Sequence, residues 1–477
     1  MKPNILFLII DGFRSDRCFG PKKSSQTPNL NSIIEQGTYF SENVTSSPVT
    51  IPSMSSIYTS LYPFRSTVLD TELYNLNSDC PNYISKLCDI GYNAYATIPE
   101  SLTVSKIPQL FKNGCDIFEY TETTFNGLGQ KIIDNIISKK FKEPWIHYIH
   151  LYDLYVATSF TIDENQSTKI LNDKKFGKNK YERVLSAMDP WIGKIIQNIN
   201  FENTILVLSG DHGTDIGEYN ETMEKWQKEN IDLRTSWEPG LPFKITKKVF
   251  QDSRLNSLKN KLKNKYVKRR TSVVKDRINS QYEKIESMDL NNYEKRIMKN
   301  AVFTKSQTYD SRFRVPLLFV GNKINKNQVI SKQVRSIDIF PTLEELLQLD
   351  LGITETHGRS LLPFLKGNIL EEEPVLMESA INSTKSESDN TIAVRTSQYK
   401  YFRDRDDPTK NVSLFDLKKD PLEEENIAEN NVEIVHNMEN TLNKLQSDKG
   451  FNIKKTSDLS DTDIKEAEDL LSKLGYI

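Results

Sequence analysis

Short apolar segments recur along the chain and give the first indication of its fold. Five of them are rich in β-branched residues and show no alternation of polar and apolar positions: ILFLII (5–10), AYATI (94–98), WIHYIHL (145–151), TILVLSG (204–210) and RVPLLFVG (314–321). Continuous hydrophobicity is typical of strands buried on both faces, as in a parallel sheet that helices cover. We therefore predict that these segments form the central strands of one sheet.

Segments with helical signals lie between the predicted strands. Residues 27–37 begin with Thr27 as a cap and Pro28 in the first helical position, and they end at Gly37, which together favour a helix. Residues 336–349 have their apolar side chains at helical spacing. The alternation of strand and helix predicts an α/β fold with a doubly wound, mostly parallel sheet.

The pattern changes between about 220 and 300, where the apolar runs disappear. Residues 243–277 hold thirteen Lys or Arg against two Asp. We predict a basic helical insertion at about 220–300. Its basic side chains either form a solvated face or contact an anionic polymer or substrate.

The C-terminal part of the chain predicts a second, smaller unit. Residues 371–390 (EEEPVLMESAINSTKSESDN) have the composition of a linker. The stretches 392–404 and 412–417 then predict antiparallel strands, and a helix is expected around 430–447. We therefore predict a large α/β domain over 1–367 and a C-terminal subdomain with an antiparallel sheet over 368–477.

Composition narrows the class of protein. The chain has 477 residues, a hydrophobic fraction of 37% and a net charge of −2, so it is globular, and its charge balance gives no sign of a nucleic-acid partner. Four cysteines without a CxxC spacing indicate neither a zinc knot nor a disulfide framework. The first apolar run, Ile5 to Ile10, is too short for a signal peptide, and no later run approaches the ~20 residues of a membrane span. The sequence therefore predicts a soluble, cytoplasmic protein with no membrane span.

Polar side chains stand where two of the predicted strands end. Asp11 follows the first strand, Asp211 and His212 follow the fourth, and Thr50 precedes a helix that opens at Pro52. Ligands of parallel α/β sheets gather beyond the carboxyl ends of the strands, so we expect these four side chains to share one divalent metal ion. Oxygen and nitrogen ligands without thiolate suit Mn, Mg, Ca or Zn. Taken alone, an Asp at a strand end is often only a helix cap.

Many ordered segments of the chain resemble the sulfatase branch of the alkaline phosphatase superfamily. They are residues 3–16, 27–42, 47–63 (SPVTIPSMSSIYTSLYP), 209–218 (SGDHGTDIGE), 305–321 (KSQTYDSRFRVPLLFVG), 336–347, 357–367 (HGRSLLPFLKG), 394–402 and 414–428. The resemblance covers nearly the whole chain. It implies an alkaline-phosphatase-like α/β domain followed by a small C-terminal α/β domain with an antiparallel sheet.

The chain departs from the sulfatase pattern where formylglycine is made. Sulfatases present Cys-x-Pro-x-Arg or Ser-x-Pro-x-Arg, and the first residue is oxidised to the aldehyde. Here Thr50 is a secondary alcohol that cannot give this aldehyde, and Met54 replaces the arginine. The Asp-Asp pair after the first strand has become Asp11-Gly12, and an Asp-Pro-His has become residues 153–155, Asp-Leu-Tyr. A formylglycine-dependent sulfatase is therefore the last of our hypotheses.

The resemblance also implies roles for Thr50 and Lys305. In phosphodiesterases and phosphoglycerol or phosphoethanolamine transferases of this superfamily an unmodified threonine, coordinated to metal, is the nucleophile. Thr50 is accordingly predicted as a nucleophile, with a helix N-cap as an alternative that is compatible with it. Lys305 matches the lysine that reaches the anionic group of the substrate, and its alternative is a surface lysine.

Three further residues are candidates for substrate binding. Residues three apart in a strand face opposite ways, so His150 and Asp153 serve one site only if the strand ends near His150. His357 stands before the segment GRSLLP (358–363), where relatives usually carry Asp, and is either a spare ligand or a loop histidine.

Two hypotheses of different classes follow. The first is a metal-dependent hydrolase or transferase of phosphate, phosphonate or sulfate esters, with Asp11, Asp211, His212 and Thr50 on the cation, Thr50 attacking and Lys305 stabilising the developing charge. Its partner would be a small-molecule or glycan-linked anionic ester. The second is a catalytically degenerate protein of the same fold that binds an anionic glycan or a partner.

Overall fold

The computed structural model describes residues 2–70, 73–100, 115–138, 141–155, 169–216, 279–302, 308–379 and 390–447. The larger of its sheets has the strand order β10-β2-β9-β8-β1-β7-β5-β6, and β11 also pairs with β2. The strands are β1 Asn4–Ile10, β2 Thr38–Val44, β5 Asn93–Pro99, β6 Asp116–Tyr120, β7 Trp145–Leu151, β8 Thr204–Gly210, β9 Arg314–Val320, β10 Gln328–Ile330 and β11 Val334–Arg335.

The predicted α/β fold with a mostly parallel sheet is confirmed. All five predicted strands are present within one residue of the expected bounds, as β1, β5, β7, β8 and β9. One of the five, β9, is the exception to the parallel arrangement, because it pairs antiparallel with both β8 and β2. Burial on both faces produced the continuous hydrophobic pattern of β9, and that burial does not depend on strand direction.

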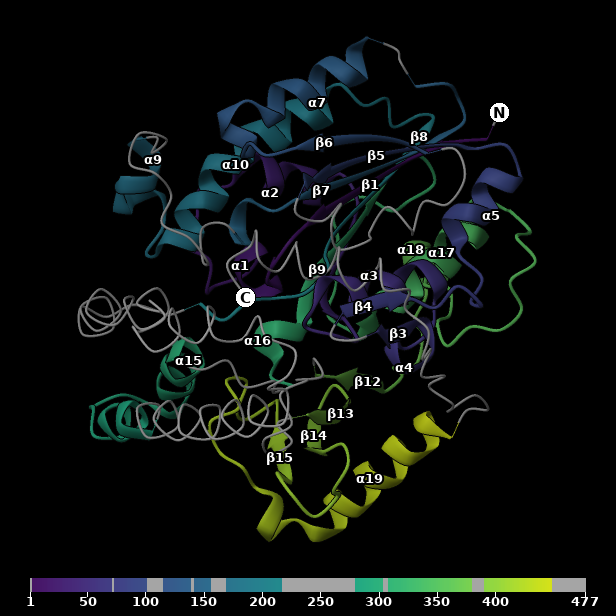
Figure 1. Cartoon of the computed structure of the whole chain (residues 1–477). Coiled ribbons are helices and arrows are strands. Elements are labelled where there is room, and N and C mark those ends of the chain that lie inside the picture. Colours follow the sequence, from purple (N-terminus) through teal and green to yellow (C-terminus); the bar gives the residue numbers. More distant parts are fainter. Residues whose placement is uncertain are drawn as a thin grey trace, which may run out of the picture. The chain divides into compact units, whose positions relative to one another are not determined.

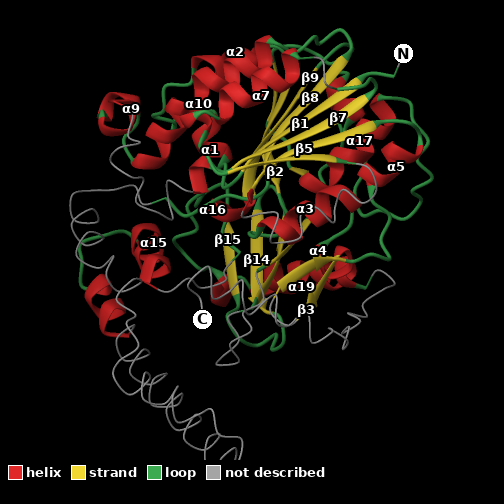
Figure 2. Ribbon diagram, turned by 45° about the horizontal axis from the view of Figure 1, so that its top comes forward, coloured by secondary structure: helices red, strands yellow, loops and turns green. Residues whose placement is uncertain are grey.

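Helices cover both faces of the large sheet (Figures 1 and 2). One face carries α2 Pro28–Glu35, α7 Leu128–Ile137 and α10 Lys180–Gln197, and the other carries α3 Thr50–Thr59, α5 Tyr83–Asp89, α17 Ile339–Leu346 and α18 Leu362–Leu365. Shorter elements are α1 Ser15–Cys18, α4 Pro63–Ser66, α9 Lys169–Asn172, α16 Asp310–Phe313 and the hairpin of β3 Thr67–Asp70 with β4 Leu73–Leu76. The 3₁₀ turns are η2 Thr124–Asn126, η4 Lys174–Phe176, η6 Ser336–Asp338 and η7 Ala428–Asn430.

The start of α2 shows how a cap can come from another helix. Thr27 occupies the N-cap position and Pro28 the first turn, as predicted, but Thr27 makes no side-chain cap bond. The buried carboxylate of Asp189 on α10 accepts from the backbone N–H of Asn29 at 3.1 Å and of Leu30 at 2.8 Å instead. Asp189 therefore satisfies the free N–H groups of this helix end.

Aromatic packing fixes α3 against the sheet. Phe7 of β1 lies 6.1 Å from Tyr58 of α3, 5.9 Å from Tyr148 of β7 and 5.6 Å from Phe340 of α17, measured between ring centroids. All four side chains are buried. Burying each such ring contributes roughly 1.5–3 kcal/mol, so the helix that carries Thr50 is held by a rigid contact with β1 and β7.

A second sheet follows toward the C-terminus. It is antiparallel in the order β12 Val375–Glu378, β13 Thr391–Arg395, β14 Tyr399–Asp404 and β15 Ser413–Asp416, and α19 Val432–Gln446 packs on it through Met438 and Leu442. This confirms the predicted antiparallel sheet and helix. The linker prediction for 371–390 is wrong at β12, whose short apolar run is buried against β13 although charged residues flank it. Residues 380–389 lie outside the described part.

A separate compact unit consists of residues 215–305 and 422–425. Its described part holds a helix at 279–286 and α15 Asn292–Val302, which pack through Ile285, Tyr293, Ile297 and Met298. The basic run 243–277 lies outside the described residues. The insertion at about 220–300 and the division into 1–367 and 368–477 stay predictions.

Among the described residues, no helix has the length and apolar character needed to cross a bilayer. The four cysteines are unpaired. The cytoplasmic location stays a prediction.

Candidate active site

The carboxyl ends of β1 and β8 bring three of the predicted metal ligands together. The two strands are neighbours in parallel register, with Ile10 opposite Gly210, so Asp11 and Asp211 leave the sheet side by side. One ligand atom each of Asp11, Asp211 and His212 lie within 4.8 Å of one another. A single cation can reach all three at ordinary coordination distances of about 2.0–2.6 Å.

The two carboxylates are oriented so that one oxygen of each is left for a cation. Oδ1 of Asp211 accepts from the backbone N–H of His212 at 2.7 Å and of Gly12 at 3.2 Å. Gly12 has a φ of +70°, which glycine adopts without strain. Asp211 Oδ2 and Asp11 Oδ1 are buried and have no hydrogen-bond partner among the described residues. Buried carboxylate oxygens without a partner are costly, and a cation would satisfy both.

The orientation of His212 completes the cluster. Its Nδ1 lies 2.9 Å from the carbonyl oxygen of Gly213, which can only accept, so Nδ1 carries the proton. The lone pair of Nε2 then faces Thr50 Oγ1 at 3.3 Å and Asp211 Oδ2 at 3.4 Å. A hydrogen bond from the ring nitrogen that does not face the metal commonly sets the tautomer of a metal-binding histidine.

The electrostatics of the cluster are governed by two buried carboxyl groups, Asp11 and Asp211, that lie close together. Burial raises the pKa of Asp211, and the charge of Asp11 raises it further. Burial also acts to raise the pKa of Asp11, but the hydrogen bond with His150 and the charge of His212 outweigh it and lower that pKa. Burial alone would lower the pKa of His212, but the charges of Asp211 and Asp11 outweigh it and raise that pKa. Such a site attracts positive charge.

Thr50 is the first residue of α3, and its hydroxyl faces the cluster. The N-cap position falls on Val49, which makes no side-chain cap bond. Thr50 Oγ1 lies 3.4 Å from Asp11 Oδ2 and 3.3 Å from His212 Nε2. In this structure the hydroxyl therefore contacts the predicted ligands, and the N-cap alternative does not hold.

The next turn of α3 holds two residues with contrasting roles. Ser53 is buried and donates to the carbonyl oxygen of Asp211 at 2.6 Å, which ties the helix of Thr50 to the loop of the ligands. The sequence analysis missed Ser53, although it stands in the segment that matched the sulfatase pattern. Met54 is fully buried in the core, so position 54 offers no cation to a substrate.

His150 is also brought to the cluster, from behind Asp11. It is fully buried at the end of β7, and its Nε2 lies 3.2 Å from Asp11 Oδ2. Its Nδ1 lies 2.5 Å from the hydroxyl of Tyr148. The sequence analysis did not single out Tyr148, although side chains two apart in a strand share a face.

The structure does not bring Asp153 or His357 to the cluster. Both oxygens of Asp153 accept from Thr124 of η2, from its N–H at 2.7 Å and its hydroxyl at 2.9 Å. His357 accepts from the N–H of Tyr62 at 2.9 Å, just beyond the end of α3 opposite to Thr50. At 1.5 Å per residue that end is roughly 15 Å away. Lys305 lies outside the described residues.

The buried carboxyl of Asp153 predicts a pH-dependent stability. Burial raises the pKa of Asp153 to about 6, although the bonds from Thr124 oppose this. Because its pKa is raised, the unfolded chain ionises first, and Asp153 lowers stability as the pH rises from about 4 to 6. In Asp153→Asn the amide oxygen can accept from the N–H of Thr124 and the amide N–H can donate to its hydroxyl. The variant should therefore gain roughly 2–3 kcal/mol over wild type across that pH range. Urea unfolding at several pH values measures it.

The exposed Asp134 on α7 gives the control for this prediction. Asp134→Asn should differ from wild type by nearly the same free energy at every pH. A constant difference for Asp153→Asn between pH 4 and 7 would contradict the raised pKa.

Two family models of known proteins match this chain. The sulfatase family model matches residues 3–349, and the model for the C-terminal part of N-sulphoglucosamine sulphohydrolase matches residues 299–448. A choline-sulfatase of Rhizobium meliloti is 23% identical over 90% of this chain and 83% of its own length. Arylsulfatase K of Gallus gallus is 32% identical over 31% of this chain and 28% of its own.

A solved structure shows the same fold. The phosphonate monoester hydrolase of Agrobacterium radiobacter superposes with a TM-score of 0.61 at 15% identity, covering 93% of this chain and 95% of the other. Identity at this level supports the fold alone.

Proposed function

The chain belongs to the sulfatase family of the alkaline phosphatase superfamily, and on this premise we propose that it is a metal-dependent ester hydrolase or transferase with Thr50 as nucleophile. One observation carries the proposal: the Thr50 hydroxyl lies 3.4 Å from Asp11 and 3.3 Å from His212. Beside it are two buried carboxylate oxygens without a hydrogen-bond partner in the described residues.

The chemistry of the donor set supports a divalent cation at this place. Asp11, Asp211 and His212 would hold it, with Thr50 as a further oxygen ligand, and this set of oxygen and nitrogen donors without thiolate suits Mn, Mg, Ca or Zn. When bound, the cation would act as a Lewis acid: it would lower the pKa of the Thr50 hydroxyl and withdraw negative charge from the ester oxygens.

The residues of the chain would then carry out a two-step reaction. Thr50 Oγ1 attacks the phosphorus or sulfur of the ester, and its proton leaves along the hydrogen bond to Asp11 Oδ2. The bond from phosphorus or sulfur to the alcohol oxygen breaks, and the alcohol leaves with a proton from solvent. In the second step water, or another alcohol in a transferase, attacks the phosphoryl or sulfuryl ester on Thr50 and gives up a proton to solvent, while Thr50 leaves and takes its proton back from Asp11. The free N–H groups at the start of α3 would favour the anionic group of the substrate. Lys305 is proposed to assist.

The relatives indicate the class of ester. One is named a choline-sulfatase and one a phosphonate monoester hydrolase. Thr50 cannot become formylglycine, so we propose phosphate and phosphonate esters ahead of sulfate esters. The buried Met54, in place of the family arginine, favours the alternative of a degenerate protein that binds an anionic glycan or a partner.

An assay of the full chain distinguishes these functions. The protein is stripped with EDTA and resupplied with MnCl₂, MgCl₂, CaCl₂ or ZnCl₂, and tested on nitrophenyl phosphate, bis-nitrophenyl phosphate, a nitrophenyl phosphonate and nitrophenyl sulfate. We expect at least one ester to be turned over only when a metal is present. Asp211→Asn should remove this activity, because an amide neither balances the cation nor offers the same donor.

The exposed Asp89 provides the matched control, since Asp89→Asn makes the same chemical change on α5, away from the cluster. No turnover of any ester with any of the four metals, together with binding of a sulfated glycan, would establish the degenerate alternative.

A further inference from the structure

A buried chain of polar side chains lies behind the Asp11 carboxylate. His150 and Tyr148 are two residues apart on β7 and both are fully buried. Nε2 of His150 is 3.2 Å from Asp11 Oδ2, and the Tyr148 hydroxyl is 2.5 Å from His150 Nδ1. Neither nitrogen of this ring is left to contact a substrate.

The direction of these hydrogen bonds follows from the groups on either side of His150, the Asp11 carboxylate and the Tyr148 hydroxyl. An ionised carboxylate can only accept, so Nε2 of His150 holds a proton and donates to Asp11. In a neutral ring Nδ1 then accepts, and the phenol of Tyr148 is the donor that faces it. Asp11 thereby sets the tautomer of His150, and Tyr148, as the donor to Nδ1, stabilises it, as hydrogen-bond partners of the ring do for histidines at other metal sites.

The two oxygens of Asp11 are used differently. Oδ2 receives the N–H of His150 and the hydroxyl of Thr50, at 3.2 and 3.4 Å. Oδ1 is buried without a hydrogen-bond partner in the described part of the chain and belongs to the cluster with Asp211 and His212. Rotation of the carboxylate about its Cβ–Cγ bond would exchange these two roles, and the bond from His150 opposes that rotation.

We propose that His150 is a positioning residue that reserves Oδ1 of Asp11 for the cation, with Tyr148 stabilising the tautomer that lets it do so. The inference rests on the proposed function, because it concerns the same cation site. It gives His150 a role through Asp11 rather than on the substrate.

The effect of removing His150 should therefore fall on metal affinity. His150→Leu leaves Oδ2 with the Thr50 hydroxyl as its one remaining donor and is expected to raise the Kd for Mn²⁺ about 10–100-fold, the range produced by loss of a residue that hydrogen-bonds a metal ligand. His150→Gln places an amide N–H near the position of Nε2 and should recover much of the affinity. Tyr148→Phe should give an intermediate Kd. Isothermal titration of the EDTA-treated full chain with MnCl₂ measures all three.

His147 supplies the matched control. It lies on the same strand, is equally buried, and its Nε2 contacts the hydroxyl of Thr97 at 2.9 Å, so it faces away from Asp11. His147→Leu should leave the Kd for Mn²⁺ unchanged even if it lowers the melting temperature. A merely structural role for His150 would make the two positions behave alike.

Kinetics at saturating MnCl₂ separate the remaining outcomes. If His150 acts through Asp11, excess metal should largely restore kcat of His150→Leu with little change in KM. A wild-type Kd in His150→Leu, or a lost kcat that metal cannot restore, would overturn the positioning role. If wild-type protein itself binds none of the four metals, the proposed function fails first and this inference with it. Should His150→Leu not fold, His150→Gln and Tyr148→Phe still decide the question.

Discussion

Replacing Thr50 by alanine is expected to abolish ester turnover while leaving the protein folded and able to bind metal. The substitution removes the hydroxyl and the γ-methyl group, and the contacts of the hydroxyl are with Asp11 and His212 rather than with the backbone of α3. Loss of a catalytic nucleophile lowers kcat in other hydrolases by about 10⁶-fold. We therefore expect the rate on bis-nitrophenyl phosphate to fall by at least on the order of 10⁴-fold.

Serine at the same position tests whether the hydroxyl itself is required. Thr50→Ser keeps an oxygen at the same reach and should retain measurable turnover. With the wild type, mass spectrometry of a rapidly quenched reaction should find the transferred group on the peptide that contains Thr50. These two measurements test whether Thr50 is the nucleophile. Metal titration of Thr50→Ala tests whether the cation still binds without the Thr50 hydroxyl.

Thr59 offers a control on the same helix. It is buried near the other end of α3, where its hydroxyl donates to the carbonyl oxygen of Ser55 at 2.7 Å. Thr59→Ala should cost about 0.5–1.5 kcal/mol of stability but preserve the activity of the folded fraction. A folded Thr50→Ala protein with wild-type turnover would show that Thr50 is not the nucleophile.

The fold was predictable where burial leaves a simple pattern in the sequence. β1, β7 and β8 are buried along their whole length, and their uninterrupted apolar residues identified them. β2 was missed because its sequence, TYFSENV, mixes apolar residues with polar ones that meet partners elsewhere, such as Asn43 with Ser336 at 3.1 Å. The antiparallel direction of β9 could not be predicted, because strand direction depends on connections that hydrophobicity does not encode.

The site was predictable as far as residues follow from strand ends. Asp11, Asp211 and His212 come directly after two strands, so their meeting required only that the strands be neighbours. His150 and Ser53 matter through partners far away in sequence, namely the Asp11 carboxylate and the Asp211 carbonyl. No local sequence pattern indicates such contacts, so the roles of His150 and Ser53 could be recognised only in the three-dimensional structure.

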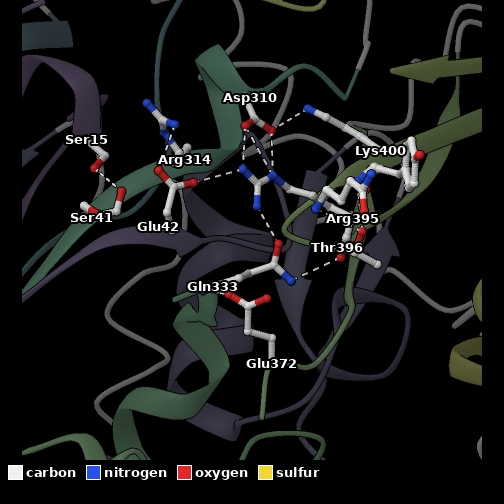
Figure 3. Close-up of polar contacts among 12 residues, drawn as sticks. Ser15, Ser41, Glu42, Asp310, Arg314, Gln333, Glu372, Arg395, Thr396 and Lys400 are labelled. Carbon is white, nitrogen blue, oxygen red and sulfur yellow. Dashed lines mark hydrogen bonds and ion pairs between the residues drawn. The ribbon is translucent and has the colours of Figure 1, made fainter. Parts of the chain in front are cut away.

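Removing the carboxylate of Asp310 is expected to destabilise the protein strongly. Figure 3 shows Asp310 between the side chains of Arg395 and Lys400, which come from the small antiparallel sheet. Arg395 donates to it at 2.9 and 3.0 Å and Lys400 at 2.5 Å. Arg395 also reaches Glu42 of β2 at 3.1 Å and Gln333 at 2.5 Å, so the network ties the small sheet to the edge of the large one.

The size of the effect follows from the burial of the two cations. The side chain of Arg395 is 3% exposed and that of Lys400 is 0% exposed. Breaking a buried ion pair by removing one partner typically costs about 3–5 kcal/mol, because the other charge stays buried. Arg395 keeps Glu42, so we expect Asp310→Asn to lose about 3 kcal/mol. Urea unfolding at pH 7 gives this value.

The pH dependence of the same variant provides an independent check. Burial alone would raise the pKa of Asp310, but the charges of Arg395 and Lys400 outweigh it and hold that pKa well below its usual range. Because the folded pKa is lowered, this stability is complete above about pH 4 and is lost as the pH falls further. The difference between wild type and Asp310→Asn should therefore shrink below about pH 4.

An exposed ion pair of the same chemical type shows what burial contributes. Asp407 lies 3.1 Å from Lys410, with side chains 39% and 66% exposed. Surface pairs are screened by solvent and contribute little to stability, so Asp407→Asn should change the free energy of unfolding much less than Asp310→Asn does. If Asp310→Asn were as mild as Asp407→Asn, Arg395 and Lys400 would have to find other partners or water when the carboxylate is lost. The tie between the two sheets would then rest on the apolar contacts of Val44 and Phe313 with Phe402 and Phe415 rather than on this charge network.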